Sequence, residues 1–182
     1  MPHPNLQPDF DEPIALFDSD PRDVAEIAAM EKTVEHIYNN EWLKTYDAPL
    51  RHYSDHPDVS FIDILSPGQY FGEDVLKWFN YISPQFVGDL GLINMRIFAK
   101  NGVGFVYMNQ TYEGTLDDGS QFVWKMRQTD VVEKIDGEWK ILHTHLSFAA
   151  TPEAKHPDRW QVDFEYPKRP PAWEVSPILA GG

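Results

Sequence analysis

The second half of the chain alternates apolar and polar residues, whereas the first half repeats apolar residues at helical spacing. Alternation with a period of two indicates strands with one buried face, and a repeat every three to four residues indicates an amphipathic helix. Four long alternating segments lie at residues 90–100, 103–115, 120–135 and 138–148. The pattern therefore predicts an α+β domain whose C-terminal half is a sheet.

Helix signals precede these strands. Ser19-Asp20-Pro21 combines capping side chains with a proline in the first turn, which predicts a helix from there to about Asn40. A shorter helix is expected to end near Tyr53. A short strand is predicted at residues 59–63, and a third helix is predicted at residues 72–83, before a proline.

The long strands are separated by three pairs of turn residues, Asn101-Gly102, Asp118-Gly119 and Asp136-Gly137. A two-residue type I′ turn needs positive φ at both central positions, which asparagine, aspartate and glycine tolerate best. We therefore expect three tight hairpins and a four-stranded antiparallel meander. The turns also predict the register of every strand pair.

Counting from these turns places a polar group on one face of the sheet. Arg96 lies opposite Tyr107 in this register. Tyr107 also lies opposite Asp130, and Asp130 lies opposite His143. The same face is predicted to carry Asn94, Asn109, Trp124, Gln128 and His145. A mixed polar and apolar face covered by helices would enclose a pocket, with Tyr38 of the first helix on its wall.

The opposite face is predicted to be apolar, with Met95, Ile97, Val106, Met108 and Val131. Such a face needs a cover, and we expect a homodimer that pairs through this outer surface of the sheet. Residues 1–18 are expected to form an N-terminal arm, residues 19–150 the domain, and residues 151–182 a C-terminal arm rich in proline and aromatic residues.

Composition excludes several classes of function. The formal net charge of −14 argues against binding to nucleic acid or to an anionic membrane surface. The absence of cysteine excludes disulfides, thiolate metal sites and cysteine nucleophiles. The sequence contains no signal peptide pattern and no apolar run long enough to span a bilayer, so a cytoplasmic protein is expected.

The order of elements resembles the nuclear transport factor 2-like superfamily. The segment Asp136-Gly-Glu-Trp-Lys-Ile-Leu-His-Thr-His-Leu-Ser147 resembles its SnoaL-like branch and is similar to the association domain of calcium/calmodulin-dependent protein kinase II. The resemblance implies a cystatin-like, cone-shaped α+β barrel, with a curved sheet around N-terminal helices. Members include isomerases, cyclases, dehydratases, ligand binders and oligomerisation modules, so the resemblance alone does not define a reaction.

Residues 59–76 resemble ketosteroid isomerase without a gap. The resemblance places Asp63 at the position of that family's general base and Asp130 at the position of its protonated, hydrogen-bond-donating aspartic acid. Arg96 and His143 in the predicted register would instead favour the charged form of Asp130, which departs from that pattern.

Ten residues are candidates for a functional site. The catalytic candidates are Asp63, Asp130, His143 and Tyr107. The candidates for substrate binding are Arg96, Asn109, Gln128, His145, Trp124 and Tyr38. No cofactor and no metal is expected.

Several alternatives remain open. Asp63 is equally consistent with a loop aspartate that caps a turn. The group Arg96–Tyr107–Asp130–His143 is also consistent with a buried structural network. His143, His145 and Asp130 together would make a metal site of two histidines and one carboxylate.

The leading functional hypothesis is a small-molecule pocket protein. It would act as an isomerase, dehydratase or hydratase on an oxygenated organic substrate by acid/base chemistry. The alternative is a non-catalytic binding or oligomerisation module that captures a small carboxylate. An apolar void ending at Asp63 would favour isomerisation, whereas a carboxylate site beside Arg96 would favour binding.

Overall fold

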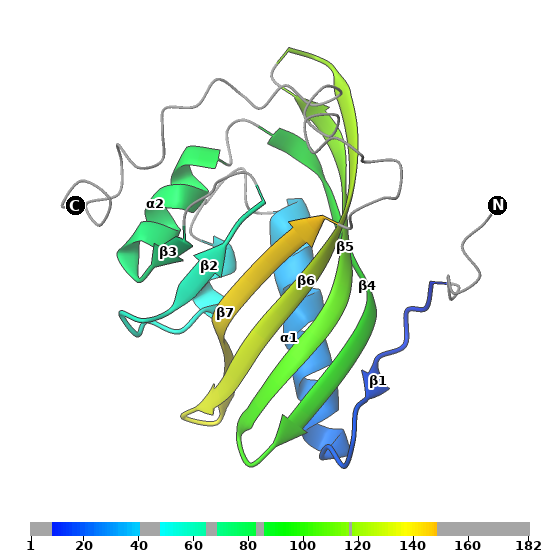
Figure 1. The fold of residues 1–182 in the computed structure, drawn as a ribbon, viewed down its shortest axis with the longest axis vertical. Helices are drawn as coiled ribbons and strands as arrows, with labels where there is room; N and C mark the ends of the chain where they lie inside the picture. Colours follow the sequence, from blue (N-terminus) through cyan, green and yellow to red (C-terminus); the bar gives the residue numbers. More distant parts are fainter. Residues whose placement is uncertain (1–8, 41–47, 65–68, 83–85, 117, 149–182) are drawn as a thin grey trace.

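The computed structural model describes residues 9–40, 48–64, 69–82, 86–116 and 118–148 of the chain. The elements in these ranges are β1 (Ile14–Ala15), α1 (Pro21–Asn40), the 3-10 helix η1 (Ala48–His52), β2 (Ser60–Ile62), β3 (Gln69–Phe71), α2 (Glu73–Ile82), β4 (Phe86–Lys100), β5 (Val103–Leu116), β6 (Gln121–Ile135) and β7 (Glu138–Phe148). The strands form one curved, unclosed sheet in the order β1-β4-β5-β6-β7-β2-β3 (Figure 1). The predicted α+β fold with a curved, mostly antiparallel sheet is confirmed.

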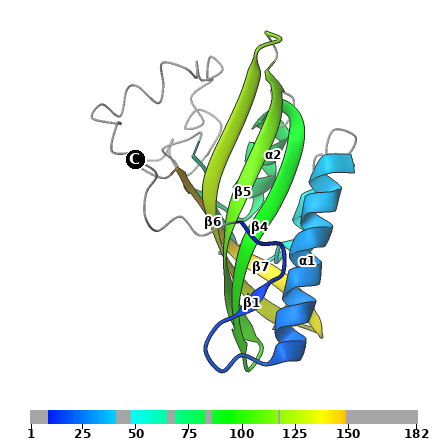
Figure 2. The same ribbon diagram turned by 90° about the vertical axis from the view of Figure 1, so that its right-hand side faces the viewer.

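Helix α1 begins where the sequence predicts. The Asp20 side chain accepts a hydrogen bond from the Arg22 backbone N–H at 2.8 Å, and the backbone oxygen of Asp20 accepts the first helical bond from Val24. The apolar stripe of α1, including Ile27 and Val34, is buried. Figure 2 shows the helix lying along one face of the sheet. We call this covered side the inner face and the other side the outer face.

The remaining described elements close one end of the inner face. Residues 48–52 form a single 3-10 turn, and residues 41–47, where the sequence predicts most of a second helix, lie outside the described ranges. Strand β2 pairs with β7 in parallel, and β3, which the sequence does not predict, pairs with β2. Helix α2 follows β3 and packs against it (Figure 1). Neither α-helix in the described ranges is long and apolar enough to cross a membrane.

The described part of the N-terminal arm lies along β4. Strand β1 pairs with β4 in parallel, and the Leu16 backbone N–H donates to the Ile97 carbonyl at 2.8 Å. The Phe17 ring packs edge-on against Phe98 on the outer face. The C-terminal arm, residues 151–182, lies outside the described ranges.

Two of the three predicted hairpins have the expected register. Lys100 pairs with Val103, and Ile135 pairs with Glu138. Both central residues of these turns have positive φ, as a type I′ turn requires: Asn101 (56°), Gly102 (78°), Asp136 (52°) and Gly137 (88°).

The third turn has a different register from the predicted one. Thr115 pairs with Gln121, so an odd number of residues separates the paired positions of β5 and β6. Of the described residues in this turn, Gly119 has a positive φ of 85°, whereas Asp118 does not. This differs from a two-residue type I′ turn, which needs positive φ at both central positions. The result is a one-residue shift, which turns β6 over relative to the predicted register.

Two bulges shift the register again. In β4, Ile93 pairs with Asn109 and Arg96 pairs with Tyr107, and Asn94 takes a positive φ of 59° at the irregularity. Asn94 was therefore wrongly predicted to lie opposite Asn109. In β7, Leu142 is an extra residue between Ile141, which pairs with Val132, and His143, which pairs with Val131. From His143 onwards, β7 is therefore shifted by one residue against β6 relative to the register at the turn.

The shifts exchange parts of the two predicted faces. The inner face carries Trp124, Met126, Gln128 and Asp130 of β6 together with Met95, Ile97, Val106 and Met108 of β4 and β5. The residues predicted to form an apolar outer face on β4 and β5 are thus buried on the side that α1 covers. The homodimer remains a prediction, but those residues cannot mediate it.

Candidate functional site

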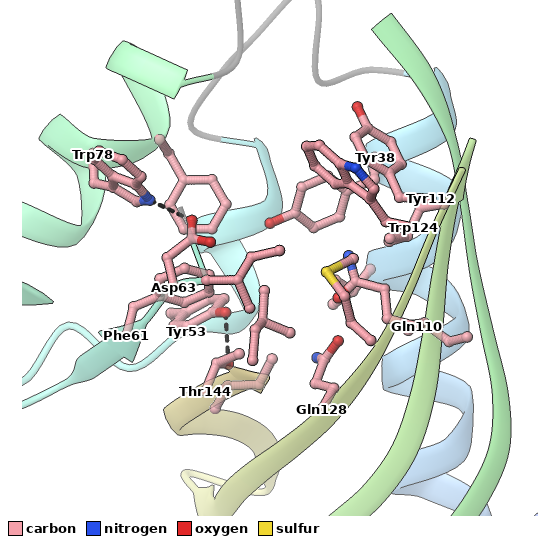
Figure 3. A pocket seen from close by; sticks show the side chains of 18 residues that line it. Tyr38, Tyr53, Phe61, Asp63, Trp78, Gln110, Tyr112, Trp124, Gln128 and Thr144 are labelled. Atoms are coloured by element: carbon pink, nitrogen blue, oxygen red, sulfur yellow. Dashed lines mark hydrogen bonds between the residues drawn. The ribbon is translucent and has the colours of Figure 1, made fainter. Parts of the chain in front are cut away.

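A cavity of about 80 Å³ lies on the inner face between the sheet, α1, β2 and α2. Its walls are mostly aromatic and aliphatic, and the aromatic members are Tyr38, Tyr53, Phe61, Trp78, Phe79, Tyr112 and Trp124. Figure 3 shows Asp63 and Trp78 on one side of the space and Gln110, Tyr112 and Trp124 on the other. This volume holds several water molecules or a small organic molecule.

Asp63 lies directly after β2 and forms part of the cavity wall. Its Oδ2 accepts a hydrogen bond from the indole Nε1 of Trp78 on α2 at 2.6 Å (Figure 3). The Tyr70 ring stacks on the Trp78 indole with ring centroids 4.7 Å apart, which holds the donor in place. A carboxylate oriented by a fixed donor beside an apolar space is suited to take a proton from a bound molecule.

Three phenols of the cavity are protonated at neutral pH. Burial raises the pKa of Tyr38 and of Tyr53 well above the usual range, and the nearby charge of Asp63 raises both further. Burial raises the pKa of Tyr112 to about 12. Because they keep their protons, the phenols of Tyr38 and Tyr112 can donate hydrogen bonds to a ligand oxygen, whereas the Tyr53 hydroxyl already hydrogen-bonds to Thr144.

The floor of the cavity is formed by polar groups of β6 and β7. Gln128 of β6 and Thr144 of β7 both line it, and the Thr144 hydroxyl hydrogen-bonds to the Tyr53 hydroxyl at 2.8 Å. Asp130 lies behind Gln128 and accepts a hydrogen bond from its Nε2 at 2.7 Å. Asp130 itself is fully buried.

Glu31 of α1 is the partner of Asp130, and it too is fully buried. Burial raises the pKa of the Glu31 carboxyl well above its usual range, and the charge of Asp130 raises it further. Burial also raises the pKa of Asp130 to about 6, although hydrogen bonds from Thr144, Gln128 and Glu31 act to lower it. Burial therefore favours the protonated form of both carboxyls.

The prediction that Arg96 and His143 surround Asp130 is wrong. Asp130 pairs with Thr144, whereas His143 pairs with Val131, so the two side chains lie on opposite faces. The Arg96 guanidinium lies on the outer face, 4.8 Å from the centroid of the Phe10 ring. The buried network proposed from the sequence is therefore replaced by the pair of Glu31 and Asp130.

The other candidates on the outer face also lie away from the cavity. Tyr107 is 47% exposed and packs against Phe105. Asn109 accepts a hydrogen bond from the Asn94 side chain at 3.0 Å. Neither residue lines the cavity, because β4 and β5 present the alternate positions to its inside.

His143 and His145 share the outer face of β7. The Ser60 hydroxyl hydrogen-bonds to His143 Nδ1 at 2.8 Å, and burial and the neighbouring His145 lower the pKa of His143. The alternative metal site of these histidines with Asp130 is not assembled, since Asp130 lies on the inner face. No group of three or more metal-ligating side chains gathers elsewhere in the described ranges.

Of the ten candidate residues, Asp63, Tyr38, Trp124 and Gln128 line the cavity. Five lining residues with a hydrogen-bonding side chain are not among the candidates from the sequence: Tyr53, Trp78, Gln110, Tyr112 and Thr144. On β5, Gln110 and Tyr112 follow the apolar Met108 at alternate positions. That alternation would have placed both residues on the inner face if the odd number of residues in the loop at Gly119 had been recognised.

Comparisons with known proteins agree with the fold. A family model described as a SnoaL-like domain matches residues 34–151. A comparison with curated proteins finds no match.

Solved structures resemble the chain over most of its length. An NTF2-like protein of unknown function from Pseudomonas putida shares 15% identity, with a TM-score of 0.62 over 76% of this chain and 94% of that one. A candidate calcium/calmodulin dependent protein kinase II association domain from Xanthomonas campestris shares 19% identity, with a TM-score of 0.62 over 81% and 99%. A candidate aromatic ring hydroxylase from Novosphingobium aromaticivorans shares 14% identity, with a TM-score of 0.64 over 74% and 94%. At these identities the likeness defines the fold alone.

Proposed function

The chain belongs to the SnoaL-like domain family, and from this premise we propose that it binds a small oxygenated ring compound and moves a proton on it with Asp63. The observation that carries the proposal is the position of the Asp63 carboxylate on the wall of an apolar cavity, oriented by the Trp78 indole. The proposed activity is isomerisation by proton transfer next to a carbonyl group.

Each step of this chemistry has a group in the cavity. The Asp63 carboxylate takes a proton from the carbon next to the carbonyl, and the electron pair of that C–H bond moves onto the carbonyl oxygen. The protonated phenol of Tyr38 donates a hydrogen bond to this developing negative charge. Asp63 then returns the proton to a second carbon, which shifts the double bond. The aromatic walls exclude water and so strengthen both interactions.

The competing hypothesis, capture of a carboxylate, has less support. Arg96, the residue selected for that role, lies on the outer face. Among the described residues that line the cavity, none is arginine, lysine or histidine, whereas Asp63 is acidic. A negatively charged ligand would be repelled there, so the cavity favours a neutral substrate.

Asp63→Asn tests the proposal. The asparagine oxygen still accepts the Trp78 hydrogen bond, but an amide cannot take the proton. We expect the rate of α-proton exchange of cyclohexanone in D2O, followed by NMR, to fall by about 100-fold or more. The ultraviolet signal for conversion of 3-cyclohexenone to the conjugated enone should fall equally, while the circular dichroism spectrum and ligand affinity stay unchanged.

Asp58→Asn is the matched control. The Asp58 side chain is 90% exposed and lies outside the cavity. The Asp58→Asn protein should therefore exchange the α-protons of cyclohexanone at the wild-type rate. An Asp63→Asn protein that retains the wild-type rate would disprove the role of Asp63. A wild-type protein with no exchange above the buffer rate would disprove proton transfer on this class of substrate.

A further inference from the structure

The floor of the cavity rests on a pair of acids that the proposed proton transfer does not use. Both oxygens of Glu31 and Oδ1 of Asp130 are buried and have no hydrogen-bond donor among the described residues. The other oxygen of Asp130, Oδ2, accepts a hydrogen bond from Gln128. This oxygen then determines how the Gln128 amide is turned.

The first neighbour is Gln128. Its amide nitrogen donates to Asp130 Oδ2 at 2.7 Å. A carboxylate accepts hydrogen bonds only, so the nitrogen must face Asp130 and the amide cannot turn over. The amide oxygen of Gln128 is therefore the part that remains for a molecule in the cavity, which Gln128 lines.

The second neighbour is Thr144, which pairs with Asp130 across the strands. Its hydroxyl hydrogen-bonds to the Tyr53 hydroxyl at 2.8 Å, and either group can be the donor (Figure 3). The acceptor of the floor is therefore the Gln128 amide oxygen.

We infer that Asp130, by fixing the Gln128 amide, turns the floor of the cavity into a hydrogen-bond acceptor and so selects a substrate that carries a hydroxyl group. This inference rests on the proposed function and narrows it. The substrate class becomes a hydroxylated ring ketone, with its carbonyl toward Tyr38 and Asp63 and its hydroxyl on the Gln128 amide oxygen. Asp130 is a positioning residue for this selection, since it acts through Gln128.

The expected selectivity follows from desolvation. A ligand that places a carbonyl oxygen on this floor brings the lone pairs of that oxygen against those of the floor's acceptor. The buried acceptor is then left without a hydrogen-bond donor. Sites that hydrogen-bond a substrate hydroxyl strongly reject analogues that lack it. We expect 4-hydroxycyclohexanone to bind at least about tenfold more tightly than cyclohexane-1,4-dione, which differs only in that oxygen.

The test is an NMR titration of the full chain with these two compounds, using the Asp63→Asn protein so that no turnover occurs. Asp130→Asn offers a donor to Gln128, allows its amide to turn over, and should abolish or reverse the preference. Glu31→Gln leaves the bond between Asp130 and Gln128 in place and should keep the preference.

Three results would overturn the inference. One is equal affinity for the two compounds, and another is a preference that survives Asp130→Asn in folded protein. The third is tighter binding of cyclohexylammonium than of cyclohexanol, which would assign the floor to a cation. None of these depends on turnover, so a failure of proton transfer by Asp63 would be recognised separately.

Discussion

Glu31 and Asp130 lose their hydration together when α1 packs on the sheet, and no cation lies beside them in the described structure to compensate for the loss. Their stability contribution therefore has the opposite pH dependence to that of an ordinary ion-paired carboxylate. Burial raises the folded-state pKa of both groups above their usual values. Each group stabilises the fold fully only below its unfolded pKa, and this contribution is lost as the pH rises through the folded pKa.

Glu31→Gln should make this loss visible. The variant removes a group that is protonated in the folded chain but ionised in the unfolded chain above about pH 4.5. We expect the variant to gain stability over the wild type as the pH rises from 4.5 to 8, by up to about 1.4 kcal/mol per pH unit, the slope for one proton. Urea denaturation of both proteins at several pH values measures this difference in the free energy of unfolding.

The wild-type curve adds an independent check. Asp130 ionises in the unfolded chain near 3.8 and in the folded chain near 6, so its contribution should disappear between those values. The loss corresponds to about 3 kcal/mol. A stability difference between Glu31→Gln and wild type that is independent of pH would contradict the raised pKa of Glu31 in the folded chain.

At the level of elements, the turns and the close strand crossings place different demands on glycine. Gly137 has φ of 88° in the β6–β7 turn, and an added Cβ would meet nothing within 4 Å. Gly104 lies in β5 with ordinary φ, but an added Cβ would lie 2.4 Å from the Phe98 carbonyl oxygen of β4. The first position is constrained by backbone conformation and the second by space.

The two alanine variants should therefore differ. Gly137→Ala should lower the free energy of unfolding by about 1–2 kcal/mol, because alanine is strained in the left-handed conformation. Gly104→Ala should cost about 3 kcal/mol or more, because β4 and β5 must separate at a central strand pair. Thermal and urea unfolding of both variants checks the order. A larger loss of unfolding free energy for Gly137→Ala than for Gly104→Ala would contradict this order. It would mean that strain in the turn destabilises the sheet more than a clash between strands.

The elements themselves were largely predictable. The helix start at Asp20 and the long strands follow from local backbone preferences and from a period of two, both of which depend on near neighbours in the chain. The turns at Gly102 and Gly137 follow from the same local rules. The register between β5 and β6 was not predictable from the Asp118-Gly119 pair, because loops of different length use the same residue types.

For the whole molecule, we expect a homodimer through the outer face. Tyr107 is 47% exposed and Val131 is 38% exposed there, beside the packed rings of Phe98 and Phe105. A cluster of exposed apolar side chains on a sheet favours contact with another surface. Equilibrium sedimentation of the full chain should give twice its 21.0 kDa mass.

Val131→Lys should weaken this dimer at least about tenfold, because it places a charge at the contact. The matched control is Leu76→Lys on α2, a residue that is 37% exposed and lies away from the outer face; its dimer should be unchanged. A wild-type chain that sediments as a monomer at all concentrations would contradict the dimer.

The order of elements, the helix start and two of the three tight turns follow from the chain alone, because each is decided within a few consecutive residues. The inner and outer faces were decided only by the folded sheet. One extra residue in a loop or at a bulge changes local energy little, yet it exchanges every side chain beyond it between core and solvent. This is why Asp130 lies inside while His143 and Arg96 lie outside, and why its partner is Glu31, a helix residue that strand alternation could not pair with it.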